Sequence, residues 1–445
     1  MRIVAGSAGS RGDVMPILEI ASELKNRGHD IHFFTPGQFV DEAKSRGLRV
    51  DRFASTYSHG LMQNLGPGWQ STKQTADWTR LSMEEQLDVL LTATQKADAL
   101  LTMANEVGAP TIAEYRRIPH FRVCVLPCLP GDQPPPVQPL QTLPPILNRV
   151  LWSGVELGTM YIFGRSLNKK RKMLGLRKVR RFADYAAGYS RNLLAIDPLL
   201  APPCRGWKYG YTYTGYPFGD DDERLSEDVE AFLAAGPPPV YIGFGSVCIP
   251  DPKRTTRIIL EALKETGDRA FIACGWTKLG KGFAIPENVL LLEEAPHRKL
   301  FPRMAGIIHH GGSGTTHNAA RAGKPQAIIP HMLDQFYWGR RIYNLGIGPE
   351  PVPEVDITKR KLVRILRELH LPAYRRNAEA VSRLMLQNGV SAIGDEVERS
   401  LGIFSSSRGA TRETACKPGC ENAAHMHDES NTPSNRLLET LPGAQ

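Results

Sequence analysis

Short apolar runs in the first half of the chain alternate with longer amphipathic segments. Residues 2–5 and 31–35 have the length and composition of buried strands, and residues 16–27 between them have the periodicity of a helix. Residues 39–46 continue the pattern as a helix and residues 48–53 as an extended segment. This alternation predicts an α/β fold, in which helices cover both faces of a parallel sheet.

The alternation stops near residue 219 and resumes after residue 235. Residues 219–230 are acidic and break the pattern, and from Asp356 to about Gly402 the pattern is helical. Between them, strands are predicted at residues 240–246, 270–273, 289–292, 307–308 and 327–329. A chain of 445 residues also suits two domains of about 200 residues each. We therefore predict a first domain at residues 1–218, a linker at 219–235, a second domain at 236–403 and a disordered tail at 404–445.

Two segments of the predicted first domain lack the alternation. Residues 56–82 are rich in Gly, Trp, Gln and Ser and are predicted to form a long loop. Residues 128–145 carry many prolines, which exclude a regular element there. We expect the proline-rich segment to form a rim around a pocket.

The composition is that of a globular protein without a membrane span. The chain is 41% hydrophobic and 23% charged, and no apolar run reaches the roughly 18 residues of a transmembrane helix. The N-terminus lacks the apolar core of a signal peptide. Seven scattered cysteines favour a reducing compartment over a disulfide framework. These features predict a cytoplasmic location.

The net charge of +9 is concentrated in one segment. Residues 165–181 contain no acidic residue, and residues 147–163 before them are apolar and aromatic. The basic residues are Arg165, Lys169, Lys170, Arg171, Lys172, Arg177, Lys178, Arg180 and Arg181. An apolar helix that continues into a basic one is typical of peripheral contact with an anionic membrane. A solvated basic face over a core helix is the alternative, and no nucleic-acid partner is predicted because no recognition module accompanies the charge.

The most specific chemistry is predicted for a glycine-rich turn after the strand at residues 307–308. The sequence HHGGSGTT runs from His309 to Thr316, with a helix predicted to open at Thr315 and Thr316. Glycines let a ligand approach the backbone, and the first N–H groups of a helix have no partners within it. Together with the helix dipole they form a site suited to phosphate.

Two polar residues follow the next predicted strand, which ends in Pro330. Asp334 and Gln335 lie just past that strand, at the carboxyl edge of the sheet, where open α/β sheets bind their ligands. A phosphate site beside a carboxylate and an amide suggests a nucleotide attached to a group rich in hydroxyls.

A second polar turn, Gly9, Ser10, Arg11 and Gly12, follows the first strand and leads to Asp13. Asp13 is expected at the carboxyl edge of that strand, where its carboxylate could take a proton from a hydroxyl. The alternative is that Asp13 only caps a helix that begins near Pro16, and both roles are compatible. The spacing of the glycines is not that of a dinucleotide fingerprint, and no ribose-binding acid follows the second strand.

Three motifs carry a resemblance that spans roughly residues 1–400. The sequences GSRGDVMP at residues 9–16, GPPPVYIGFGS at residues 236–246, and HHGGSGTT with the later DQ are similar to those of nucleotide-sugar glycosyltransferases of the two-Rossmann-domain (GT-B) type. The closest resemblance is to sterol glucosyltransferases, antibiotic-aglycone glycosyltransferases and lipid rhamnosyltransferases. It implies two Rossmann-like domains whose sheets face a central cleft. It also implies that the last helix, expected within residues 378–401, crosses back onto the first domain.

The resemblance also implies roles for individual residues. Asp13 matches the general base of an inverting, metal-independent transfer, and His310 rather than His309 matches the imidazole that touches the diphosphate. Asp334 and Gln335 match the pair that binds the hydroxyls of the donor hexose. The remaining expected donor contacts are Ser246, Gly312, Ser313, Gly314, Thr315, His297 at the uracil ring, and Trp276 as a stacking or core residue.

The donor implied by the sterol-type relatives is UDP-glucose, and dTDP-sugars are the alternative implied by the antibiotic and rhamnosyl relatives. The acceptor is expected to be an apolar alcohol such as a sterol, a lipid or a polyketide-like aglycone. No cofactor is expected. A non-catalytic module that binds nucleotide sugar or lipid is a rival reading, but Asp13 and the Asp334–Gln335 pair are both present.

Metal binding is not predicted. Asp220 and Asp222 formally match an Asp-x-Asp motif, but they lie in the acidic linker with no strand before them. Cys416, Cys420, His425 and His427 in the tail match no familiar zinc spacing. A nucleotide-sugar epimerase and an NAD-dependent oxidoreductase are disfavoured, the second because the dinucleotide fingerprint is missing.

Overall fold

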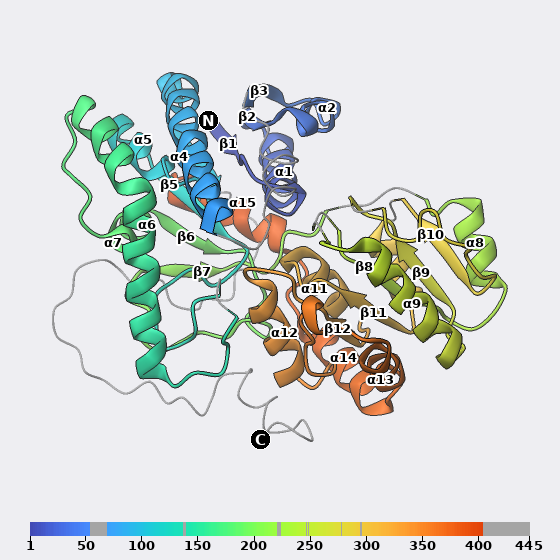
Figure 1. The fold of residues 1–445 in the computed structure, drawn as a ribbon. Coiled ribbons are helices and arrows are strands. Elements are labelled where there is room, and N and C mark those ends of the chain that lie inside the picture. The colour runs from blue at the N-terminus through green and yellow to red at the C-terminus, as the bar shows by residue number, and fades with distance from the viewer. Residues whose placement is uncertain are drawn as a thin grey trace.

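Two parallel sheets form the framework of the protein (Figure 1). The computed structural model describes residues 1–403 except 54–68, 137–138, 220–223, 246, 248, 277 and 294–295, with the side chains of residue 53 and residues 69–79 also outside the description. The statements below refer to these described residues. Each sheet is flanked by helices, as the alternation of the sequence predicts.

The first sheet has seven strands in the order β3-β2-β1-β4-β5-β6-β7. In chain order the strands are β1 Arg2–Gly6, β2 Asp30–Pro36, β3 Arg49–Phe53, β4 Ala99–Met103, β5 His120–Cys124, β6 Arg191–Leu194 and β7 Tyr211–Tyr213. Alternate residues of β1 enter different cores, because successive side chains of a strand point to opposite faces. Ile3 and Ala5 pack on one face and Val4 on the other, so the strand is apolar throughout.

Six α-helices accompany the first sheet. They are α1 Arg11–Asn26, α2 Val40–Ser45, α4 Trp69–Ala93, α5 Ala109–Arg116, α6 Pro145–Met173 and α7 Phe182–Gly188. Helix α1 packs against the face that contains Ile3, whereas α4, α5 and α6 contribute to the core on the face that contains Val4. None of the described helices is both long and apolar enough to cross a membrane.

The second sheet has five strands in the order β10-β9-β8-β11-β12. The strands are β8 Val240–Gly243, β9 Ala270–Ala273, β10 Val289–Leu292, β11 Gly306–His309 and β12 Gln326–Ile328. The helices that follow residue 226 are α8 Glu227–Ala234, α9 Pro252–Thr266, α10 His297–Leu300, α11 Ser313–Arg321, α12 Gln335–Asn344, α13 Lys359–Leu369, α14 Pro372–Leu384 and α15 Gly389–Ser400. Single 3₁₀ turns occur at η1 Gly37–Phe39, η2 Thr94–Lys96, η3 Phe301–Arg303 and η4 Glu354–Asp356.

Three local predictions were wrong. Helix α1 begins at Arg11, so Pro16 lies inside it rather than at its start. Helix α11 begins at Ser313, two residues before the predicted start. Residues 69–82, predicted as part of a loop, belong to α4, whose C-terminal half is anchored by the buried Leu87 and Leu90. The polar N-terminal half of α4 carries no apolar periodicity, which is why the sequence pattern missed it.

Helix α15 returns to the first domain and packs on α1, as expected (Figure 1). The segment 378–401 is two helices, and α14 stays with the second sheet through its contact with α11. Ile393 and Val397 of α15 enter the core beside β1. Arg27, just after α1, forms ion pairs with Asp395 at 2.7 Å and Glu398 at 3.0 Å, and it donates to the carbonyl of Ser391 at 3.0 Å.

Replacement of Arg27 by alanine is expected to loosen α15. Its guanidinium is only 18% exposed and serves partners on both helices, so its loss should lower the free energy of unfolding by about 1–3 kcal/mol. Urea titration measures this change, and amide exchange in residues 389–400 locates it. The control is Arg399→Ala, because Arg399 is 53% exposed and pairs only within α15 with Glu396. Equal effects of the two variants would contradict the assignment.

Candidate functional site

Side chains near the carboxyl edges of the two sheets touch one another, and we call the region between these edges the cleft. The hydroxyl of Ser313, the first residue of α11, donates to the carbonyl of Val125, which follows β5, at 2.7 Å. Tyr216 stacks on His317 of α11 with a centroid distance of 4.7 Å. The turns after β1, β4, β8, β11 and β12 therefore face a common space, as the edge rule for parallel sheets requires.

Asp13 caps the helix in which it lies. Ser10 is the N-cap of α1, and the Asp13 Oδ2 accepts hydrogen bonds from the Ser10 N–H at 2.8 Å and the Ser10 hydroxyl at 3.0 Å. Among the described residues Oδ1 has no hydrogen-bond partner. Burial raises the pKa of Asp13, and the two bonds from Ser10 oppose that rise. The capping oxygen and the available oxygen are different atoms, so the two roles considered for Asp13 are compatible.

The turn before Asp13 has little room. A Cβ atom on Gly9 would lie 2.3 Å from the Asp13 Oδ2, so the carboxylate occupies the space that any other residue would need. Arg11 is exposed and pairs with Glu42 at 3.3 Å. Burial lowers the pKa of His297 in the second domain to about 4, and the charges of His309 and Arg11 add smaller contributions. Gly12 is exposed and lies near the Ser10 hydroxyl.

Glu106 is a second acidic residue beside the turn after β1, and the sequence analysis did not predict it. It follows β4, is 3% exposed, and its Oε1 accepts the N–H of Ala8 at 2.5 Å. Its Oε2 is buried without a partner among the described residues. Burial, with a smaller contribution from the charge of Asp13, raises the pKa of Glu106 to about 8. The edge rule, applied to β4 as it was to β1, would have found this residue.

His310 lies in a space that glycines leave open. A Cβ atom on Gly312 would lie 2.5 Å from the His310 Nε2, and one on Gly245, in the turn after β8, would lie 3.2 Å from its Cε1. The Nδ1 atom is buried without a partner in the described structure. Burial, followed by the neighbouring imidazoles of His309, His331 and His297, holds the pKa of His310 well below its usual value. The imidazole is therefore neutral at physiological pH.

His309 differs from His310 in that both of its ring nitrogens are engaged. It is fully buried, its Nε2 lies 2.8 Å from the Gln326 Oε1, and its Nδ1 accepts the N–H of Gly311 at 3.1 Å. It thus holds the shape of the turn. Of the two adjacent histidines, only His310 has a buried nitrogen left to face a ligand.

The start of α11 serves both the interface and the cleft. Gly312 is its N-cap and supplies no side-chain cap to the first N–H groups. The Ser313 hydroxyl donates to the Val125 carbonyl. A Cβ atom on Gly314 would lie 2.8 Å from the Tyr216 hydroxyl. Thr315 is partly buried. Backbone N–H groups, more than the Ser313 hydroxyl, are what this turn offers to an anion.

Asp334 and Gln335 each use one side-chain oxygen for hydrogen bonds within the protein. The Gln335 Oε1 accepts the N–H groups of His331 at 2.7 Å and Met332 at 3.0 Å, and the Asp334 Oδ2 accepts the Trp338 Nε1–H at 3.1 Å. The Asp334 Oδ1 and the Gln335 amide NH₂ have no partners among the described residues. Burial, with a contribution from the charge of Asp13 across the cleft, raises the pKa of Asp334 to about 6.

The remaining predicted donor contacts lie around the same edge. His297 stacks on Phe301 with a centroid distance of 4.2 Å, and its Nε2 lies 3.3 Å from the Tyr241 hydroxyl. Trp276 is half-buried beside the turn after β8, where its backbone N–H donates to the Gly245 carbonyl at 3.4 Å, so it is not a core tryptophan. Ser246, the Asp220–Asp222 motif and the Cys and His residues of the tail lie outside the described residues.

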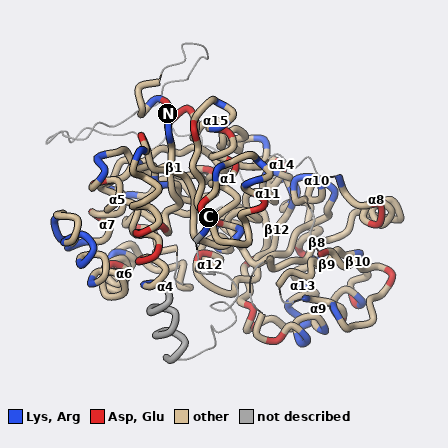
Figure 2. Tube along the Cα trace, turned by 90° about the horizontal axis from the view of Figure 1, so that it is seen from above, with Lys and Arg blue, Asp and Glu red and all other residues tan. Residues whose placement is uncertain are grey.

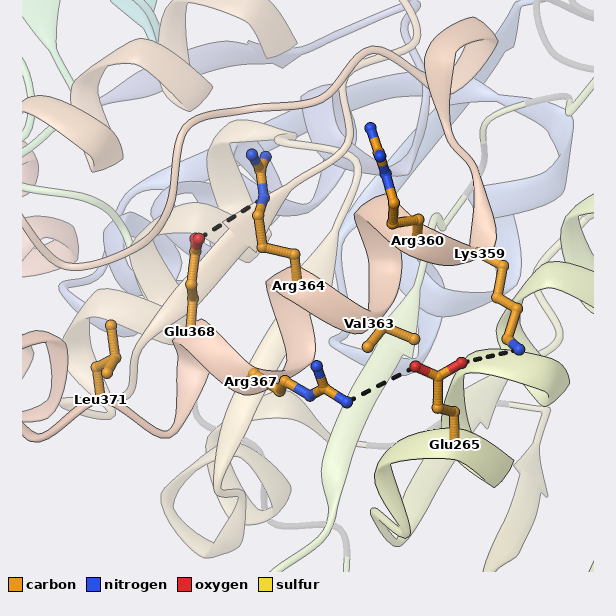
Figure 3. A pocket seen from close by; sticks show the side chains of 8 residues that line it. All are labelled: Glu265, Lys359, Arg360, Val363, Arg364, Arg367, Glu368 and Leu371. Carbon is orange, nitrogen blue, oxygen red and sulfur yellow. Dashed lines mark ion pairs between the residues drawn. The ribbon is translucent and has the colours of Figure 1, made fainter.

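A separate hollow of about 520 Å³ lies between α9 and α13, away from the cleft (Figure 3). Two acidic and four basic side chains line it: Glu265 pairs with Lys359 and Arg367, and Arg364 pairs with Glu368 (Figure 3). None of the predicted site residues lines it, so it does not compete with the cleft as the functional site. The described residues also contain no cluster of three or more His, Cys, Asp or Glu side chains placed to hold a metal ion.

Comparison with known proteins agrees with this geometry. Residues 3–130 match the N-terminal domain of glycosyltransferase family 28, and residues 258–393 match the C-terminal domain of erythromycin biosynthesis protein CIII-like proteins. A sterol 3-beta-glucosyltransferase of Arabidopsis thaliana is 30% identical over 426 residues, which cover 90% of this chain and 68% of that protein. The vancomycin aglycone glucosyltransferase of Amycolatopsis orientalis is 30% identical over 411 residues, with 88% and 98% covered.

A solved structure shares the fold at lower sequence identity. The glycosyltransferase VinC, determined in complex with dTDP, superimposes with a TM-score of 0.61 at 19% identity and covers 90% of this chain and 98% of its own. The two facing parallel sheets, the turns at their carboxyl edges and the two relatives at 30% identity lead to one conclusion. The chain belongs to the GT-B glycosyltransferases, the family that includes these sterol and antibiotic-aglycone glucosyltransferases.

Proposed function

We propose that this glycosyltransferase moves glucose from UDP-glucose to the hydroxyl of an apolar acceptor such as a sterol, a lipid or a polyketide-like aglycone. The observation that carries the proposal is the position of Asp13 opposite the donor-side turns. Burial is the largest cause of the raised pKa of Asp334, and the charge of Asp13 adds to it, which supports a position of the two carboxylates near each other. The names of the Arabidopsis thaliana relative and of the vancomycin aglycone relative both contain glucosyltransferase, which supports glucose as the sugar.

The chemistry we propose is a single displacement with inversion. The acceptor O–H gives its proton to Asp13, the acceptor oxygen forms a bond to the anomeric carbon, and the bond from that carbon to the β-phosphate oxygen breaks. The electron pair of the broken bond leaves with the nucleoside diphosphate. The available Oδ1 and the raised pKa of Asp13 support a proton-accepting role, because a carboxylate with a higher pKa is a stronger base.

The leaving diphosphate would be stabilised without a metal ion or cofactor. The uncapped N–H groups at the start of α11 and the helix dipole provide positive potential, and the His310 imidazole can donate one hydrogen bond. Asp334 and Gln335 would bind the hexose through the Oδ1 and the NH₂ group that have no partners among the described residues. A dTDP-sugar is the alternative donor, favoured by the dTDP bound in the structure of VinC.

Release of free nucleotide from a donor panel tests the proposal. UDP-glucose, other UDP-sugars and dTDP-sugars are supplied with EDTA, with and without a mixture of sterols and lipid alcohols. Release that rises with one acceptor class supports the transferase and names the donor. Tight nucleotide-sugar binding without release from any donor would favour the non-catalytic module instead.

Asp13→Asn should reduce turnover by about 10²–10⁴-fold, the range typical of a lost general base. Asparagine can still accept the two hydrogen bonds from Ser10, so the helix cap and the affinity for UDP should change little. In the unmodified protein, turnover should rise with pH through the elevated pKa of Asp13, because only the unprotonated carboxylate accepts a proton. Transfer that persists in Asp13→Asn at the original rate would disprove the base assignment.

His310→Ala should weaken UDP binding and turnover together. Gly312→Ala should mimic it, because the added methyl would occupy the position of the His310 ring. Calorimetric titration with UDP measures both effects. Gly158→Ala is the matched control, since a Cβ atom there meets nothing within 4 Å. If Gly312→Ala binds UDP like the control, the phosphate role of this turn is wrong.

We also propose that α6 rests on an anionic membrane surface. Apolar side chains form an exposed stripe along α6 from residue 146 to 161: Ile146, Val150, Leu157 and Tyr161 are 71%, 63%, 71% and 88% exposed. Arg165, Lys169 and Lys172 continue the same face of the helix at intervals of three and four residues, and they are exposed. In Figure 2 the trace is blue, the colour of Lys and Arg, at several positions near α6 and α7.

Not all of the predicted basic segment is available to a membrane. Arg171 is buried and pairs with Glu114 at 2.8 Å, Lys170 pairs with Asp88, and Arg181 pairs with Asp184 at 3.5 Å. The other six basic residues are exposed. Four free cysteines, Cys124, Cys128, Cys204 and Cys274, support a reducing compartment, so we propose the cytoplasmic face of the membrane.

Reversal of charge at Arg165, Lys169 and Lys172 to glutamate should weaken binding to phosphatidylserine vesicles by about a hundredfold or more. The expected size follows from about 1 kcal/mol per basic residue near an anionic surface. Co-sedimentation measures it. The control variant reverses Lys253, Arg257 and Lys264 on α9, which are also exposed. Equal loss in both variants would mean that net charge alone, and not α6, governs the contact.

A further inference from the structure

His331 is a half-buried histidine between β12 and the Asp334–Gln335 pair, and neither the sequence motifs nor the mechanism above uses it. Its Nε2 is buried and has no hydrogen-bond partner in the described part of the chain. A buried polar atom without a partner destabilises the folded protein, so a site that retains one needs an explanation.

The hydrogen bonds of the ring define which nitrogen carries the proton. The His331 Nδ1 lies 2.9 Å from the carbonyl oxygen of Ile329, and a carbonyl can only accept, so Nδ1 is the protonated nitrogen. The unpartnered Nε2 is then a lone-pair acceptor. Burial lowers the pKa of His331 to about 4, so this neutral form persists at physiological pH.

The ring is held rigidly beside both parts of the donor site. It packs on Phe244 of the turn after β8 with a centroid distance of 5.1 Å, and the adjacent Gly245 lies against His310. The backbone N–H of His331 is bound by the Gln335 Oε1 at 2.7 Å. His331, Gln335 and Asp334 are therefore positioned by one turn, in which Leu333 has a left-handed backbone with φ of 50°.

We propose that the Nε2 of His331 accepts a hydrogen bond from a hydroxyl of the donor hexose and so acts as a specificity-determining residue beside Asp334 and Gln335. This inference rests on the proposed function. An unprotonated ring nitrogen accepts a hydrogen bond from a hydroxyl but repels a phosphate oxygen. The protonation state of His331 therefore favours the hexose over the diphosphate as its partner. Asp334 supplies an acceptor and Gln335 a donor, and His331 would add an acceptor from a fixed direction.

The experiment compares UDP-glucose with its 2-, 3-, 4- and 6-deoxy analogues, or the matching dTDP-sugars if dTDP is the nucleotide turned over. For the unmodified protein, one analogue should lose about tenfold or more in kcat/KM, because it leaves Nε2 unpaired. His331→Asn keeps a donor for the Ile329 carbonyl but has no acceptor in place of Nε2. It should lose a similar factor with UDP-glucose and little more with that one analogue.

Two controls separate this inference from its alternatives. UDP lacks the hexose, so the Kd of UDP by calorimetry should be unchanged in His331→Asn, and the exposed His370→Asn should change neither measurement. Equal discrimination among the analogues before and after the substitution would overturn the proposal, as would weakened UDP binding with proton uptake, which would assign His331 to the phosphates. If no nucleotide sugar is bound or consumed by the unmodified protein, the proposed function itself fails.

Discussion

The cleft depends on one buried imidazole, that of His317, which fixes the donor-side helix α11 against the first domain. Its Nδ1 donates to the Ser313 carbonyl of its own helix at 2.8 Å, and its Nε2 accepts the N–H of Asp197, which follows β6, at 3.2 Å. Tyr216 stacks on one side of the ring and Trp338 of α12 meets it edge-on at 5.2 Å. Burial keeps the ring neutral by lowering its pKa to about 4, so this tautomer is stable.

The same contacts place the catalytic groups that we propose. Trp338, which contacts His317, donates a hydrogen bond to Asp334. Ser313, which is hydrogen-bonded to His317, begins the helix whose N–H groups face the cleft. Both sides of the donor site therefore contact His317. The core around Trp338 contains residues of both domains, among them Cys124, Leu194 and Ile342. Helix α15 makes a second contact by packing on α1, the helix that contains Asp13. The distance between the acceptor side and the donor side is thus set by packed side chains.

Burial dominates the electrostatics of the cleft. It raises the pKa values of Asp13, Glu106 and Asp334, and it lowers those of His297, His309, His310 and His331. Both changes favour neutral side chains, because a dehydrated charge without a partner is costly. Positive potential for an anionic ligand then comes chiefly from backbone N–H groups and the α11 dipole, which need no ionised side chain.

The sequence by itself determined the alternation of strands and helices, the glycine turns and the edge positions of Asp13, His310, Asp334 and Gln335, because these follow from local periodicity and the rule that parallel strands share a carboxyl edge. It did not distinguish the engaged His309 from the available His310 by geometry, and it missed Glu106 and His331. Those assignments depend on which ring nitrogens and carboxylate oxygens find partners, and some of the partners lie far away in the chain, as Ala8 does for Glu106 and Gln326 for His309. Only the tertiary structure decides such pairings, since hydrogen-bond saturation is a property of the packed surroundings and not of the local sequence.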